Sequence, residues 1–152
     1  MTLYPPTHEL DPDWSPETVA VIAGRPAADP GAPMNVPLVL TSTYRHDAAV
    51  GYGRDGNMGW GALEEAVGTL EGGSAIAFSS GLAAAQAVAD LVPPNGIVVL
   101  PTVAYYGVHM IFRPMEEAGR LTIRMVDASD TDAVIAACDG AFMVWMESMT
   151  NP

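Results

Sequence analysis

The fold is decided by one stretch, Ser74-Ala75-Ile76-Ala77-Phe78-Ser79-Ser80-Gly81-Leu82-Ala83-Ala84-Ala85. A short apolar run of strand type meets two serines and a glycine, and an alanine-rich segment typical of a helix follows. A helix start exposes unpaired backbone N–H groups and the positive end of the helix dipole, so this junction can hold a phosphate group. Gly81 allows close backbone approach, and Ser79 and Ser80 add hydroxyl donors. A plain helix cap has the same residues, so this stretch alone does not separate the two interpretations.

Strands and helices alternate on both sides of this junction. The pattern predicts strands at residues 74–78, 97–100, 121–126 and 141–146, and helices from 60 to the glycines at 72 and 73, then at 81–92, 106–118 and 130–138. Such alternation is typical of an α/β fold with a largely parallel sheet flanked by helices. Ligands of such sheets bind at the carboxyl ends of the strands. Residues 79–81, 101–106 and 147–151 all follow predicted strands, so we expect the site there.

The first 59 residues are organised differently. Ser15 and Pro16 predict a helix start, and Gly24 predicts its end. Residues 38–44 are β-prone and fit either a strand or an extended arm. Residues 45–59 form a long glycine-spaced loop, which in a compact domain is usually functional or disordered. We therefore divide the chain into an N-terminal arm with its loop, residues 1–59, and a domain, residues 60–152.

Composition restricts the partners of this chain. The net charge is −12 and the six cationic side chains are all arginine. Because binding to nucleic acid or to an anionic membrane surface needs clustered cations, neither partner is expected. The chain contains no lysine, so chemistry that needs a lysine amine requires another source. Hydrophobic residues make up 49% of the sequence, which predicts that another chain covers part of this surface.

The sequence also bears on the cellular compartment and on metal binding. We see neither a signal peptide nor an apolar run long enough to span a membrane, and the single cysteine fits a reducing cytoplasm. The three histidines share no metal-like spacing, and four aspartates near the last predicted helix are expected to lie in loops and caps. These residues are His8, His46, His109, Asp127, Asp130, Asp132 and Asp139.

Six short motifs occur in an order that resembles a known family. They are Pro37-Leu38 with Thr41-Ser42-Thr43-Tyr44, Tyr52-Gly53-Arg54 with Asn57, Ala62-Leu63-Glu64 with Leu70-Glu71-Gly72-Gly73, Phe78-Ser79-Ser80-Gly81-Leu82-Ala83-Ala84, Tyr105-Tyr106-Gly107, and Glu147-Ser148-Met149-Thr150-Asn151-Pro152. The chain resembles the Cys/Met-metabolism family of pyridoxal 5′-phosphate (PLP) enzymes, which includes cystathionine γ-synthase, cystathionine γ-lyase and methionine γ-lyase. The resemblance covers residues 35–152 and implies the aminotransferase-like PLP fold type I. The chain would supply the N-terminal arm and the first half of the large, mostly parallel-sheet domain.

The resemblance implies two sets of phosphate-binding residues. Ser80, Gly81 and Leu82 match the segment that cradles the cofactor phosphate, in agreement with the helix-start reasoning. Tyr52 and Arg54 match residues that reach this phosphate from a neighbouring subunit, a task that suits a planar guanidinium. An ordinary solvated loop is the alternative for this second pair.

The resemblance also assigns residues to the cofactor ring. Tyr106 matches the tyrosine that stacks on the pyridine ring and takes part in acid–base steps of eliminations, although Tyr105 could be mistaken for it. Asn151 matches the asparagine that hydrogen-bonds the phenolic oxygen of PLP, and Glu147 accompanies it in the same motif. Ordinary packing and a simple turn are the alternatives.

Two departures from the family pattern bear on function. Asn57-Met58-Gly59 replaces the usual Asn-Pro-Thr near the substrate entrance, which leaves the substrate open. The sequence also stops before the family's aspartate that pairs with the pyridine nitrogen and before its Schiff-base lysine. We favour a split enzyme, in which a second polypeptide supplies both residues and further copies build a dimer or tetramer of such pairs. The expected reaction is β/γ-elimination or γ-replacement on a sulfur-containing or related amino acid. The alternatives are a non-catalytic phosphate- or PLP-binding or regulatory module, and a truncated remnant.

Overall fold

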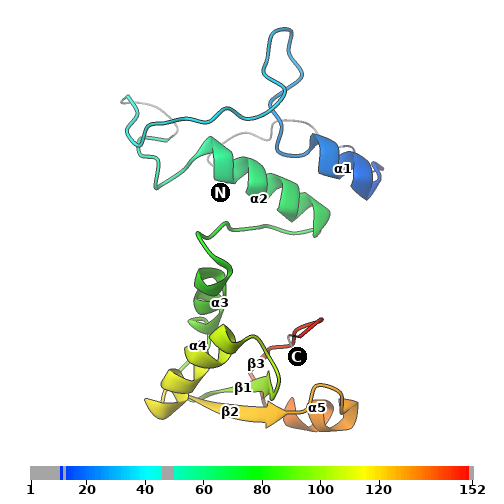
Figure 1. Ribbon diagram of the computed structural model, residues 1–152, viewed down its shortest axis with the longest axis vertical. Helices are drawn as coiled ribbons and strands as arrows, with labels where there is room; N and C mark the ends of the chain where they lie inside the picture. The colour runs from blue at the N-terminus through cyan, green and yellow to red at the C-terminus, as the bar shows by residue number, and fades with distance from the viewer. Residues whose placement is uncertain (1–10, 12, 46–49, 151–152) are drawn as a thin grey trace. The chain divides into compact units, whose positions relative to one another are not determined.

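The computed structural model of the chain describes residues 11, 13–45 and 50–150, and structural statements below refer to these residues. The chain divides into two compact units, Met1–Ala77 and Phe78–Pro152, which are drawn in Figure 1. Each unit is described by itself. The predicted division between residues 1–59 and 60–152 concerns the assembled enzyme and stays a prediction.

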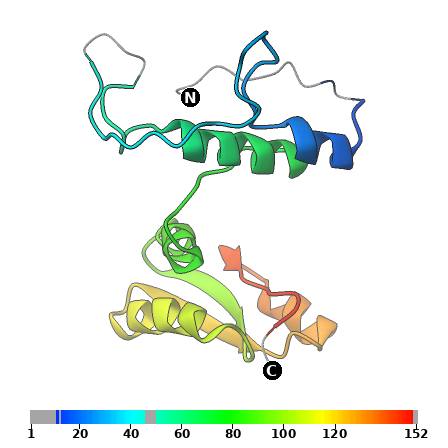
Figure 2. The ribbon, with the colours of Figure 1, turned by 45° about the horizontal axis from the view of Figure 1, so that its top comes forward.

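The described part of the first unit contains two helices, α1 (Pro16–Ile22) and α2 (Met58–Leu70). Ser15 caps α1 as predicted, because its hydroxyl oxygen accepts a hydrogen bond from the N–H of Thr18 at 3.4 Å. The chain leaves α1 through Gly24, whose φ of +75° suits glycine. A Cβ at Gly24 would lie 2.3 Å from the carbonyl oxygen of Ala62 in α2, so only glycine permits this close approach. Figure 2 shows the two helices of this unit lying side by side.

The described part of the connection between α1 and α2 has almost no regular structure. Residues 38–42 form no regular strand, and Leu38 and Leu40 are 94% and 98% exposed. One antiparallel bridge joins Thr43 to Tyr52, and the N–H of Gly53 donates to the carbonyl oxygen of Ser42 at 2.7 Å. Of the two structures that the sequence left open for residues 38–44, the extended arm is therefore the one observed.

The second unit has the predicted α/β architecture. Its three strands are all parallel, in the order β2-β1-β3, so the first strand in the chain lies in the middle of the sheet. Val98 of β1 pairs with Ile123 of β2 on one side and with Met143 of β3 on the other. The elements in chain order are α3 (Gly81–Ala89), β1 (Gly96–Pro101), α4 (Tyr106–Glu117), β2 (Leu121–Val126), α5 (Thr131–Ala137) and β3 (Met143–Val144).

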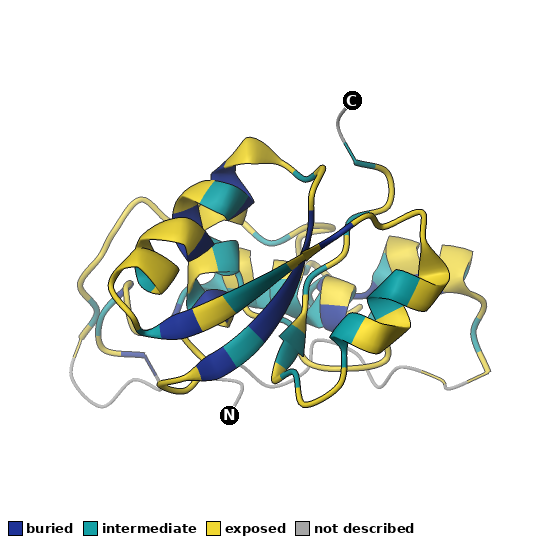
Figure 3. Cartoon of the chain, turned by 90° about the horizontal axis from the view of Figure 1, so that it is seen from below, coloured by how far each residue is buried: buried dark blue, intermediate teal, exposed yellow. Residues whose placement is uncertain are grey.

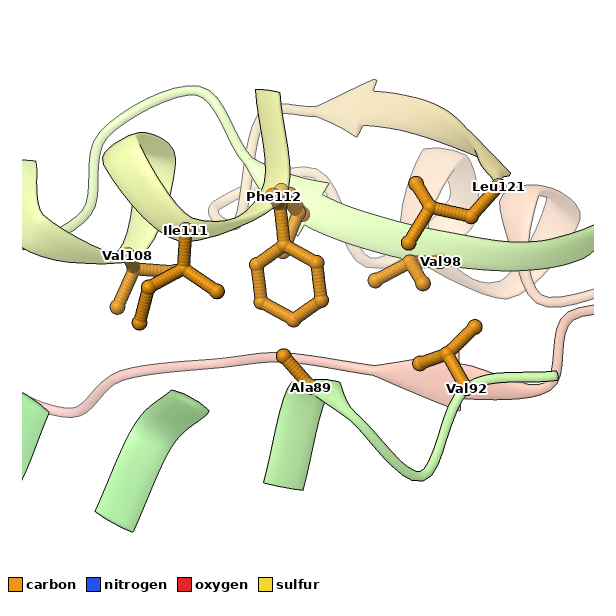
Figure 4. Packing of buried hydrophobic residues seen from close by; sticks show 8 residues of the cluster. Ala89, Val92, Val98, Val108, Ile111, Phe112 and Leu121 are labelled. Atoms are coloured by element: carbon orange, nitrogen blue, oxygen red, sulfur yellow. The ribbon is translucent and has the colours of Figure 1, made fainter. Parts of the chain in front are cut away.

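The core of this unit lies between the sheet and the helices α3 and α4. In Figure 4 the ring of Phe112 points from α4 toward Ala89 of α3, with Val98 of β1 beside it. Phe112 is fully buried, and burial of such a side chain stabilises the fold by about 1.5–3 kcal/mol. The core residues are Ala89, Val92, Val98, Leu100, Val108, Ile111, Phe112 and Leu121.

A different helix, α5, packs beside β2. Arg124 of β2 donates from Nη1 to the carbonyl oxygen of Ala137, at the end of α5, at 2.8 Å. Figure 3 shows β2 with buried residues at its two ends and more exposed residues between them. By contrast, Val98, Val99 and Leu100 of the central strand are all completely buried. This is the pattern expected of a parallel strand that is covered on both faces.

The structure corrects two of the predicted strands. Residues 74–78 do not form a strand: the N–H of Ala77 donates to Oε1 of Glu64 at 2.8 Å, and Ile76 is 75% exposed. A strand exists only beside a neighbour, and no described segment pairs with this one. The last strand comprises residues 143–144 instead of 141–146, although Phe142 and Trp145 still donate backbone hydrogen bonds to β1.

Helix α3 is shorter than predicted for a local reason. It ends at Ala89, and the N–H of Val92 donates to the carbonyl oxygen of Ala89 in a tighter turn before the two prolines at 93 and 94. In the described part of the chain, no helix is both long enough and apolar enough to cross a membrane.

Candidate functional site

In the described part of the chain, the start of α3 has hydrogen-bond donors without a partner. The hydroxyl oxygen of Ser80 accepts from the N–H of Ala83 at 3.1 Å, which leaves the hydroxyl proton available for donation. Within the described residues, the N–H groups of Gly81 and Leu82 have no hydrogen-bond partner. A Cβ at Gly81 would meet no atom within 4 Å. The predicted phosphate-binding residues therefore present two N–H groups and one hydroxyl at the positive end of a helix dipole.

A second helix start lies against the first. Gly107, in the first turn of α4, is buried, and a Cβ there would lie 2.5 Å from Cε1 of Tyr105 and 2.8 Å from Cδ1 of Leu82. The absence of a side chain at Gly107 thus lets Leu82 of α3 and the ring of Tyr105 pack together. Tyr106, the predicted catalytic residue, lies between Tyr105 and Gly107 in the chain and is 74% exposed. The structure thus brings the predicted residues at the starts of α3 and α4 together.

Glu147 connects the segment after β3 to the start of α4. Its Oε2 accepts a hydrogen bond from the backbone N–H of Tyr105 at 2.8 Å, and its Oε1 accepts from Nε1 of Trp145 at 3.2 Å. Both carboxylate oxygens are thus engaged by protein donors. The sequence indicated the motif that contains Glu147 but did not indicate these two partners. Asn151, from the same motif, lies outside the described residues.

Tyr52 and Arg54 belong to the first compact unit. The guanidinium carbon of Arg54 lies 4.8 Å from the centre of the Tyr52 ring, within the range of a cation–π interaction. The loop that carries them is closed by a hydrogen bond from the N–H of Asp55 to the carbonyl oxygen of Tyr52 at 2.9 Å. The structure therefore joins the two residues as a pair, and their role toward the phosphate stays a prediction.

Acidic side chains after β2 accept hydrogen bonds that stabilise a turn and a helix start. Asp127 follows β2 and accepts hydrogen bonds from the hydroxyl of Ser129 at 2.7 Å and from its N–H at 2.9 Å. These two bonds, the hydroxyl first, lower the pKa of the Asp127 carboxyl below its ordinary value. Asp130 caps α5 by accepting from the N–H of Ala133 at 3.0 Å. Among the described residues, no group of histidine, cysteine and carboxylate side chains is arranged to hold a metal ion.

The sequence profile of the family described as Cys/Met metabolism PLP-dependent enzyme matches residues 17–152. The chain belongs to this family. Cystathionine gamma-synthase of Mycobacterium tuberculosis is 36% identical over 147 residues, which are 90% of this chain and 38% of that protein. Cystathionine gamma-lyase of Mus musculus is 32% identical over 124 residues, which are 77% of this chain and 31% of that protein. The chain thus spans well under half the length of these relatives.

Solved structures of the Cys/Met metabolism family confirm the predicted fold type I. The structure of metB from Corynebacterium glutamicum superimposes with a TM-score of 0.82 at 31% identity, over 94% of this chain and 40% of that one. The cystathionine gamma-lyase from Micromonospora echinospora gives a TM-score of 0.79 at 29% identity, over 91% and 38% of the two chains. The chain therefore has the fold of the N-terminal portion of these enzymes.

The residues of the second unit fit the cofactor of the family. The phosphate of PLP is an anion, and the start of α3 offers Ser80, Gly81 and Leu82 as uncharged donors beside open space. The exposed ring of Tyr106 lies at the adjoining helix start, where an aromatic ring can stack on a pyridine. The Tyr105-Tyr106-Gly107 motif included Gly107 without indicating its packing role, and sequence reasoning did not indicate Trp145.

Proposed function

We propose that this chain cradles PLP in a transsulfuration-type enzyme that catalyses β/γ-elimination or γ-replacement on a sulfur-containing or related amino acid. The observation that carries the proposal is the start of α3, where Gly81 and Leu82 have free N–H groups at the edge that also carries Tyr106. The family membership supports the cofactor. The relatives, named as cystathionine gamma-synthases and cystathionine gamma-lyases, support the class of substrate.

Five residues of this chain would hold the phosphate end of the cofactor. Ser80, Gly81 and Leu82 would bind the phosphate through one hydroxyl and two N–H groups, and Tyr52 with Arg54 would add charge from a neighbouring subunit. When bound, PLP supplies an electron sink for bonds at the Cα atom of an amino acid. These five residues would fix its position.

The other residues would act at the ring of the cofactor. Asn151 would hydrogen-bond its phenolic oxygen, and the ring of Tyr106 would lie against the pyridine. The phenol of Tyr106 can hold or move a proton, which eliminations require. Binding and proton transfer would therefore reside in this chain, at the starts of α3 and α4 and in the segment after β3.

We propose further that a second polypeptide supplies the lysine that carries the cofactor and the aspartate that pairs with its pyridine nitrogen. The 152 residues contain no lysine. A PLP-dependent enzyme needs a lysine amine to attach the cofactor as a Schiff base. Two features support a further chain that pairs with this one. Residues 74–78 have the pattern of a strand but pair with no described segment. At the edge of the sheet formed by β3, Phe142 and Val144 are 55% and 44% exposed.

The lack of a lysine also favours a second candidate function, a non-catalytic module that binds PLP or another phosphate compound. Both functions use the same donors at the start of α3. They differ in whether the cofactor becomes covalently attached to protein.

One experiment separates these functions. The chain is expressed with its neighbouring reading frame, purified natively, reduced with sodium borohydride and analysed by intact-mass spectrometry. A second polypeptide that co-purifies and carries one pyridoxyl mass supports the split enzyme. A single longer chain with that mass contradicts the second polypeptide, and uptake of PLP without any covalent mass supports the non-catalytic module.

A further inference from the structure

The start of α4 lacks a capping side chain of its own. Tyr105 occupies the N-cap position and its side chain accepts no hydrogen bond from the first turn of the helix. The first N–H groups of a helix have no partner within the helix, so an acceptor from elsewhere stabilises them. At this helix the acceptor is Glu147, whose Oε2 lies 2.8 Å from the nitrogen of Tyr105 across a separation of 42 residues.

The other oxygen of Glu147 is bound by a side chain that is itself fixed. Oε1 accepts from the indole of Trp145, whose backbone N–H donates to the carbonyl oxygen of Val99 in β1 at 2.9 Å. The Trp145 ring also meets Phe112 edge to face, with 5.8 Å between ring centres. Glu147 therefore links the start of α4 to the central strand and to the core.

The partners of Glu147 make a carboxylate the suitable group. Both are neutral N–H donors, and no arginine in the described part of the chain forms an ion pair with it. A negative charge also interacts favourably with the positive end of the α4 dipole. Glutamine has the same shape but offers only one acceptor oxygen and an NH₂ group, which would face one of the two donors. It can satisfy one partner only.

We propose that Glu147 is a positioning residue that fixes the start of α4 and, through it, Tyr106. The carboxylate holds Tyr105, the residue directly before Tyr106, and its oxygens are already used by protein donors. In this proposal Glu147 acts on the cofactor site indirectly, in place of the direct role at the cofactor that the resemblance implies for it. This inference rests on the proposed function in one respect, that Tyr106 lies against PLP.

The first test asks whether the link exists and does not need PLP. In the full chain, the indole N–H resonance of Trp145 is identified by NMR from its loss in Trp145→Phe. We expect this resonance to shift in Glu147→Gln, because the acceptor of the indole N–H changes from a carboxylate oxygen to an amide group. Hydrogen exchange of the Tyr105 amide should be about tenfold faster in this variant. Glu117→Gln, which removes the same charge from an exposed position of α4, should change neither signal.

The second test asks whether Glu147 acts through Tyr106. PLP dissociation constants are measured by titration for the assembly of this chain with its partner, in a double-mutant cycle of Glu147→Gln and Tyr106→Ala. We expect Glu147→Gln to weaken PLP about fivefold when Tyr106 is present and less than twofold when it is absent. An equal loss in both backgrounds would mean that Glu147 contacts PLP directly and would overturn the proposal.

The two tests fail independently. An unchanged Trp145 resonance in Glu147→Gln would refute the link itself. If the wild-type assembly takes up no PLP, the proposed function fails, while the indole and amide signals still decide whether Glu147 holds the start of α4.

Discussion

The rings of Phe112 and Trp145 meet edge to face, with centres 5.8 Å apart and planes at 68°. Phe112 is fully buried in α4, whereas Trp145 follows β3 near the end of the described chain. This contact joins the core to the segment that carries Glu147. Edge-to-face pairs contribute about 0.5–1.5 kcal/mol beyond the burial of their area. The position of the site thus depends on core packing.

Phe112→Ala should therefore be among the most damaging substitutions in the second unit. Removal of a fully buried phenylalanine lowers the free energy of unfolding by about 3–5 kcal/mol through lost burial and a residual cavity. Urea unfolding of the full chain, followed by circular dichroism, measures this change. Phe142→Ala is the matched control, because its side chain is 55% exposed and should cost much less. Equal losses in both variants would contradict the described core.

Substitution by alanine should affect stability differently at two glycines of the site. A Cβ at Gly107 would collide with the side chains of Tyr105 and Leu82, so Gly107→Ala should lower the free energy of unfolding by about 1–3 kcal/mol. A Cβ at Gly81 meets nothing, so Gly81→Ala should leave stability within about 0.5 kcal/mol. If the phosphate occupies that space, Gly81→Ala should still weaken PLP binding. Thermal unfolding and PLP titration measure the two effects, and normal PLP affinity in Gly81→Ala would contradict the cradle.

Arg54→Ala should weaken the retention of PLP. Loss of a charged hydrogen bond to a phosphate costs about 1.5–3 kcal/mol, which corresponds to about tenfold or more in the dissociation constant. Cofactor absorbance after gel filtration measures retention in the assembled enzyme. Arg113→Ala, at an exposed position of α4, is the control for the lost charge. Similar retention in both variants would remove Arg54 from the phosphate site.

Tyr106→Phe should separate binding from proton transfer. The variant keeps the aromatic ring, so PLP affinity should change little, while loss of the phenol should lower kcat by about a hundredfold or more. Steady-state kinetics with the assembled enzyme measures kcat and KM. Tyr105→Phe is the control, since the structure engages the backbone N–H of Tyr105 and packs its ring against Gly107. A larger loss of kcat in Tyr105→Phe would reverse the assignment of the two tyrosines.

Asp127 should titrate below the ordinary aspartate pKa of about 3.9. The hydroxyl and N–H of Ser129 stabilise the ionised carboxyl and so lower its pKa. Because the folded-state pKa is the lower one, this contribution to stability is complete above the ordinary value and is lost as the pH falls through the folded value. NMR titration measures the pKa, and Ser129→Ala should raise it toward the ordinary value. An unchanged pKa in that variant would contradict the hydrogen bonds.

Local signals were sufficient for most elements of the second unit. The apolar runs at β1 and β2 are bounded by turn residues, so their predicted bounds agree with the structure to within one residue at each end. Residues 74–78 have an equally strong strand pattern but form no strand, because pairing depends on a neighbour that the sequence pattern does not contain.

The contacts of the site were only partly predictable. The helix-start pattern indicated Ser80 and Gly81, since glycine and serine at a helix start have a local physical meaning. Tyr106 was indicated by the resemblance to the family alone. The hydrogen bond from Tyr105 to Glu147 spans 42 residues and depends on the sheet order, so no local pattern reveals it. The same holds for Gly107, whose importance lies in the side chain of Leu82 from another helix.

The sheet order has a consequence for the nascent chain. β1 lies between β2 and β3, yet it is synthesised before both of them. One edge of β1 therefore stays unpaired on the ribosome until the whole segment through β3 has emerged. An open edge on an apolar strand invites wrong pairing with other nascent chains, and it gives chaperones a target. Synonymous codons that slow translation between β2 and β3 should thus reduce the yield of native chain without changing a single residue.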